Sequence, residues 1–241
     1  MVSAISSVKH ANRPVVFLLL QQDAGGHTDM SCRNSVIVML MLVCCVRSMA
    51  AASPPAADCA VSIRIHDYAQ VEARQLQYAE RQVSDAYTRI GVRLDWRRAV
   101  RPSEIEAGRG RWPDDAAFFT IVVLAPEMAS KLALPSEVAG YAPITREHGG
   151  RVAYVLGGRT RDIAAAGGTD HSTVLAAVIA HELAHLLMPA RSHSPDGVMR
   201  ALWNPAEFQR FYRERFSVAE GDSIRQAVVA LRGGSPVRVA D

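Results

Sequence analysis

The run His181–His185 (HELAH) constrains this sequence more than any other feature. On a helix, residues four positions apart share a face, so His181 and His185 can direct ring nitrogens at the same point. Two histidines at this spacing with an adjacent glutamate are typical of zinc hydrolases, in which the carboxylate reaches a water at the metal. His193 follows His185 after seven intervening residues and supplies a third imidazole. Three protein ligands leave a fourth position open, which distinguishes a catalytic zinc site from a structural one.

The residues before this run indicate a buried helix. Most side chains between Ser172 and Ile179 are aliphatic, and Asp170 or Ser172 can cap the helix start. Pro189 ends the helix and lets the chain turn, so that His193 can return to the metal. Buried histidines and a buried glutamate need polar partners, and a metal ion meets that need.

The segment from His181 to Met199 resembles the metzincin clan of zinc peptidases, in which a third histidine follows the helix and a methionine turn lies under the metal. The resemblance implies that His181, His185 and His193 bind Zn²⁺ and that Met199 is the methionine of the turn. Glu182 would then be the general base of peptide-bond hydrolysis. The chain departs from the standard pattern because no glycine follows the second histidine and because His193 lies two residues later than expected.

Alternating and apolar runs predict an α+β fold. Strands are expected at 59–66, 92–96, 118–124, 140–144 and 151–156, and helices at 71–90, around the HELAH run and after a capping box at 217–220. This order resembles the metzincin N-terminal subdomain, and residues 59–231 resemble small secreted bacterial proteins with the same histidine spacing. The resemblance implies a small mixed twisted sheet with a long helix and an active-site helix, followed by a short helical C-terminal subdomain.

By the same resemblance, Gly140, Tyr141 and Ala142 belong to an antiparallel edge strand above the cleft. An exposed edge can pair with an extended peptide, and glycine permits close backbone approach. An ordinary loop is the alternative for this segment. Tyr141, Tyr154 and Tyr212 are candidates for stabilising an oxyanion, and the sequence does not choose between them.

Residues 30–52 have the pattern of a secretory signal. Arg33 gives a positive start, Val36–Val46 is a run of eleven apolar residues, and small residues up to Ser53 offer cleavage sites. Eleven residues are too few for a comfortable membrane span, so a secreted or periplasmic protein is expected. An uncleaved N-terminal anchor is the alternative.

A signal peptide should lie at the N-terminus, so translation is predicted to start at Met30. The expected organisation is a leader over residues 1–52 and one catalytic domain over residues 53–241. Cys59 is the only cysteine in that domain, so no internal disulfide is expected there, and Cys59 should begin a strand. The net charge of +3 is too small to indicate a nucleic-acid partner. A peptide or protein substrate and a monomeric state are expected.

Two alternative interpretations of the site remain. In a gluzincin-type site, Glu207 or Glu214 would replace His193 as the third ligand. His193 is preferred because Gly197 and Met199 follow it in the metzincin manner. The other interpretation is a catalytically inactive exported module that binds zinc, against which the Glu182 base argues.

Overall fold

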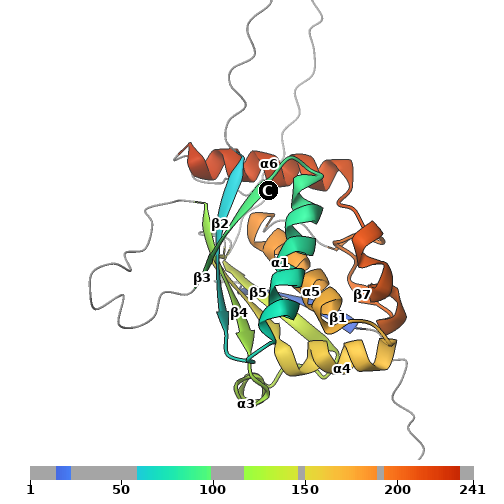
Figure 1. Ribbon diagram of the computed structural model, residues 1–241. Coiled ribbons are helices and arrows are strands. Elements are labelled where there is room, and N and C mark those ends of the chain that lie inside the picture. Colours follow the sequence, from blue (N-terminus) through green and yellow to red (C-terminus); the bar gives the residue numbers. More distant parts are fainter. Residues whose placement is uncertain (1–14, 23–58, 99–116, 146–149, 189–192, 234–241) are drawn as a thin grey trace, which may run out of the picture.

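The structure is a computed structural model that describes residues 15–22, 59–98, 117–145, 150–188 and 193–233 (Figure 1). The predicted signal segment, its cleavage sites and the proposed start at Met30 lie outside these residues. In the described ranges, no helix is long and apolar enough to cross a membrane.

The molecule is built around one mixed sheet with the strand order β3-β2-β4-β6-β5-β1-β7. The strands are β1 Val15–Gln22, β2 Ala60–Asp67, β3 Arg93–Arg98, β4 Phe118–Leu124, β5 Val138–Thr145, β6 Val152–Leu156 and β7 Leu202–Trp203. Most neighbouring strands are parallel, whereas β5 is antiparallel to β6 and β7 is antiparallel to β1. The prediction of a mixed sheet is therefore confirmed, and so is the antiparallel direction of β5.

The long helices α1 (Ala73–Thr88) and α5 (His171–Leu187) pack against each other over the sheet (Figure 1). Side chains alternate along a strand, so every second residue of the inner strands faces these helices. The apolar residues of that face form one buried cluster with the helices; on β2 and β4 they include Val61, Ile63, Phe119, Ile121 and Val123. Cys59 is half-buried against this cluster directly before β2, as expected.

The other helical elements are shorter than α1 and α5. They are α3 Pro126–Ala129, η1 Ser130–Leu132, α4 Gly157–Gly167, η2 Pro205–Arg213 and α6 Val218–Arg232. The capping box predicted at Ser217 is present and opens α6. α4 was not expected, and the aromatic segment after Met199 forms the 3₁₀ helix η2. Its residues Phe208 and Phe211 are buried in the core.

The prediction that β5 is an open edge strand is wrong for the described structure. Gly140, Tyr141 and Ala142 do lie in β5, which pairs with β6 on one side. On its other side, β1 runs parallel to β5, from Val16 opposite Val138 to Gln22 opposite Thr145. Residues 15–22 belong to the predicted leader, and a pairing between segments so far apart has no local sequence signal.

Candidate metal centre

Helix α5 carries the central residues of the site into the core. It begins where the Asp170 carboxylate accepts a hydrogen bond from the Ser172 backbone N–H at 2.8 Å, so Asp170 is the cap of the two that were expected. Every residue from Val174 to Leu187 is buried, because the sheet, α1, α4 and η2 all contact this helix. His181, Glu182 and His185 are each 0% exposed.

The three histidines converge through their Nε2 atoms. His185 Nε2 lies 2.9 Å from His181 Nε2 and 3.2 Å from His193 Nε2, and all three ligand atoms lie within 4.8 Å of one another. Ligands about 2.0–2.1 Å from a tetrahedral zinc ion stand about 3.3 Å apart, so these separations suit a shared ion. The geometry therefore groups the three predicted ligands as a possible metal site.

Hydrogen bonding orients His181 for this role. Its Nδ1 lies 2.8 Å from the backbone carbonyl of Val198 and donates to it, which leaves the Nε2 lone pair facing the other histidines. His185 Nδ1 is buried and has no hydrogen-bond partner among the described residues. The carbonyl of Val198 was missed by sequence reasoning, because a backbone atom leaves no signature in the sequence.

Burial keeps the histidines neutral. It lowers the pKa of His181 well below its ordinary value, with a further contribution from neighbouring His185. Burial lowers the pKa of His185 to about 3, and it also lowers the pKa of His193. Metal binding requires deprotonated imidazoles, so these environments favour the binding form at neutral pH.

Glu182 has the environment of a carboxylate that needs a partner. Both of its carboxylate oxygens are buried, and neither has a hydrogen-bond partner in the part of the chain that is described. Burial raises the pKa of this carboxyl well above its ordinary value. A buried unpaired carboxylate is costly, and a metal site with its water resolves that cost. The residues present therefore fit a metal ion.

Strand β5 packs directly on Glu182 through Gly140. A Cβ atom at position 140 would lie 2.9 Å from Cγ and Oε1 of Glu182 and 2.7 Å from Cγ1 of Val178. Only glycine allows the strand to come this close. Gly140 was predicted to permit close approach of a peptide, and the structure shows that it permits close approach of Glu182.

His193 opens a tight turn that also contains the predicted turn methionine. The Ser194 N–H donates to the Met199 carbonyl at 2.8 Å, and Gly197 has a positive φ of 71°. Met199 is 1% exposed in the core, next to the Val198 residue whose carbonyl orients His181. One turn thus carries both the third histidine and the group that orients the first.

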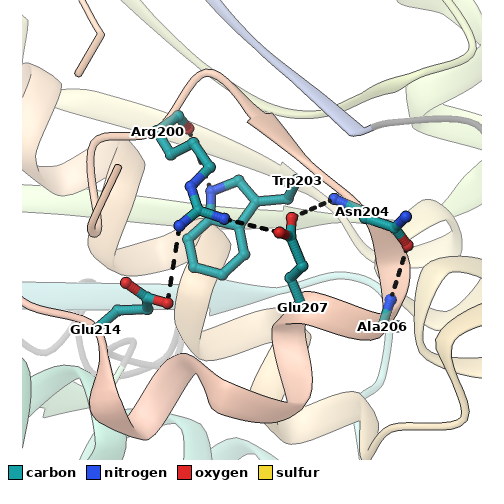
Figure 2. Close-up of polar contacts among 6 residues, drawn as sticks. All are labelled: Arg200, Trp203, Asn204, Ala206, Glu207 and Glu214. Atoms are coloured by element: carbon teal, nitrogen blue, oxygen red, sulfur yellow. Dashed lines mark hydrogen bonds and ion pairs between the residues drawn. The ribbon is translucent and has the colours of Figure 1, made fainter. Parts of the chain in front are cut away.

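Glu207 and Glu214 are engaged elsewhere. Figure 2 shows both carboxylates directed at Arg200, with Glu207 at 3.1 Å and Glu214 at 3.9 Å. The Arg200 guanidinium stacks 5.0 Å above the ring of Trp203, and Glu207 also accepts a hydrogen bond from the Asn204 N–H at 2.8 Å. The histidine cluster is completed by His193, so the geometry gives the two glutamates a structural role rather than that of a third ligand.

The candidate tyrosines do not face Glu182. Tyr141 of β5 and Tyr154 of β6 are paired across the strands and stack with ring centroids 4.8 Å apart. Gly140 is the neighbour of Tyr141 and faces α5, so the two tyrosines point to the opposite face of the sheet. Tyr212 on η2 is 52% exposed. The sequence could not reveal this, because a strand register decides which face a residue occupies.

Comparison with protein-family models gave no match, and comparison with curated proteins gave none either.

Replacing Gly140 by alanine should destabilise the protein and disturb Glu182. The added methyl group overlaps Val178 and Glu182 in a packed core, and such overpacking typically costs about 1–3 kcal/mol. Urea unfolding measures this loss. The matched control is Gly158→Ala, whose new methyl would meet mainly the ring of Pro126 at 3.1 Å, away from the histidines. Equal free energies of unfolding for the two variants would contradict the tight contact at Gly140.

Proposed function

We propose that this chain is an exported zinc-dependent metalloendopeptidase of the metzincin type. The observation that carries the proposal is the convergence of three histidine Nε2 atoms beside a buried glutamate that lacks a protein partner. The HELAH run, His193 and the following methionine turn support the clan. Export rests on the signal pattern of residues 30–52.

Zinc is the metal that this donor set favours for hydrolysis. Imidazole nitrogen suits zinc, copper, iron and nickel, and three histidines with an open position are typical of catalytic zinc. His181 and His185 are held neutral by burial, which is the state that a zinc ion requires.

Glu182 is the general base of the proposed reaction. A bound zinc ion would lower the pKa of a water and polarise the scissile carbonyl. Glu182 accepts the proton of that water and delivers it to the leaving amine as the peptide C–N bond breaks. Burial raises the pKa of Glu182, and a positive metal ion nearby would favour the carboxylate form that the base requires. The water would supply the attacking oxygen, so no side chain of the site would need to form an acyl intermediate.

Strand β5 is the proposed docking edge for the substrate. Its backbone touches Glu182 at Gly140, so a peptide paired with β5 would pass close to the base. In the described structure, β1 occupies this edge. Cleavage of the leader between Ala50 and Ser53 would remove β1 and leave this edge of β5 open to a peptide.

One observation favours an inactive zinc-binding module as the second candidate. Glu182 is 0% exposed, and a catalytic base must meet its substrate. In this candidate, the histidines would hold zinc without any peptide reaching Glu182.

Metal analysis and a cleavage assay on the same sample test the proposal. We expect about one zinc ion per chain, because the structure groups three ligands at one site, and cleavage in a peptide library that a chelator abolishes. Full zinc occupancy without cleavage of any peptide would support the binding module. A chain without bound zinc would overturn both candidates. N-terminal sequencing of exported material tests export separately, with cleavage expected between Ala50 and Ser53.

A further inference from the structure

A buried glutamate of the C-terminal helix reaches the metal-site turn. Glu220 is 3% exposed, and its Oε2 accepts a hydrogen bond from the Ser217 backbone N–H at 2.7 Å. That bond belongs to the capping box of α6. Its other oxygen, Oε1, accepts a hydrogen bond from the hydroxyl of Ser194. The capping box explains the first contact but not the second, which joins α6 to a residue 26 positions earlier.

Ser194 is the residue directly after His193. Its backbone N–H is bound to the Met199 carbonyl at 2.8 Å, and its side chain is bound to Glu220. Helix α6 is itself fixed in the core by Ile224 and Val228, which are each 0% exposed. Ser194 is therefore held by both its backbone and its side chain, and the hydroxyl links it to a rigid helix.

His193 needs such support more than the other two histidines. His181 and His185 project from a buried helix, and the carbonyl of Val198 also orients His181. His193 follows that helix in a non-helical segment, and its ring stacks on His181 with centroids 5.1 Å apart. A ligand on a non-helical segment loses more conformational freedom on binding unless its neighbours are already fixed.

We propose that Ser194 and Glu220 are positioning residues that fix His193 for metal binding. Neither residue belongs to the group of three histidines that would hold the metal. They act through the backbone of His193, so their loss weakens metal binding and leaves the ligand set intact. The inference rests on the proposed metal site and is independent of peptide cleavage.

Zinc titration of Ser194→Ala against a competing chromogenic chelator tests the proposal. Loss of a residue that orients a ligand typically weakens metal binding by about 10–100-fold, and we expect Ser194→Ala to fall in this range. Ser217→Ala removes the cap bond to the Glu220 N–H but keeps the Glu220 carboxylate on Ser194. It should lower the thermal stability of the metal-free protein and leave zinc affinity within about threefold of wild type, well short of that range. Ser223→Ala, on the exposed side of α6, should change neither property.

A second comparison separates positioning from general stability. In a His193→Ala background the ligand is gone, so adding Ser194→Ala should cause no further loss of zinc affinity. The proposal is overturned if Ser194→Ala binds zinc as tightly as wild type, or if Ser217→Ala weakens zinc binding as much as Ser194→Ala does. It is also overturned if the losses of zinc affinity caused by His193→Ala and Ser194→Ala add in the double variant. Wild-type protein that binds no zinc would overturn the metal site and this inference together. A zinc-binding protein that cleaves nothing would leave the inference standing and remove only the peptidase proposal.

Discussion

Glu182→Gln should retain zinc and lose peptide cleavage by a factor of about 10²–10⁴, the usual contribution of a general acid–base group. The amide has nearly the shape of the carboxylate, so it fits the space beneath Gly140. It cannot accept a proton from water. The measurements are zinc content and kcat/KM on one good peptide from the library.

A matched control guards against nonspecific effects of this substitution. Glu72→Gln changes an exposed glutamate directly before α1 and should leave both zinc and cleavage unchanged. If Glu182→Gln cleaved peptides as fast as wild type, Glu182 would not be the base, and the hydrolase proposal would lose its main support.

The second large effect is expected for His185→Ala, which should lose both zinc and activity. His185 Nε2 lies 2.9 and 3.2 Å from the Nε2 atoms of the other two histidines, so it occupies the middle of the ligand set. Removing a direct ligand should weaken zinc binding by more than the roughly 10–100-fold expected for a residue that only orients one. Competition titration with a chelator measures the change.

His171→Ala is the appropriate control, because it removes another buried histidine from the same helix. The His171 ring contacts the Thr160 hydroxyl at 3.0 Å and the Gln75 side chain at 3.2 Å, away from the metal-site histidines. This variant should lower stability and keep its zinc. Zinc retained by His185→Ala, or lost by His171→Ala to the same extent, would show that the three-histidine site is misassigned.

The elements predicted correctly from sequence have strong local signals. Strand β4 spans the predicted residues 118–124, because a continuous apolar run is typical of a strand buried on both faces. Helix α5 begins at the predicted Asp170 cap, and the four-residue spacing of its histidines fixes their common face. All three ligands, His181, His185 and His193, could therefore be predicted from their spacing and from the resemblance.

The features that were missed depend on contacts distant in sequence. Helix α4 starts with Gly157 and Gly158, which are poor helix formers. A Cβ at Gly157 would lie 2.5 Å from the Ala69 Cβ, so packing against a distant loop requires glycine there. The link from Ser194 to Glu220 and the pairing of β1 with β5 likewise join segments whose proximity only the fold establishes.

Strand β1 shows in which direction an extended chain runs beside β5, the strand that carries Gly140. In the described sheet, β7 is joined to the other strands through β1, which runs parallel to β5 and antiparallel to β7. Without β1, the rows of backbone N–H and C=O groups on β5 and β7 would face each other across two strand spacings, about 9.5 Å. That gap admits one extended chain, paired with β5 along most of its length and with β7 over two residues at its N-terminal end. A peptide that reproduced the bonds of β1 would enter with its N-terminal end beside Trp203, which pairs with Val15, and run toward Thr145, which pairs with Gln22. An incoming backbone of either direction would be parallel to one of these strands and antiparallel to the other, and the direction of β1 is the one that the described sheet accommodates.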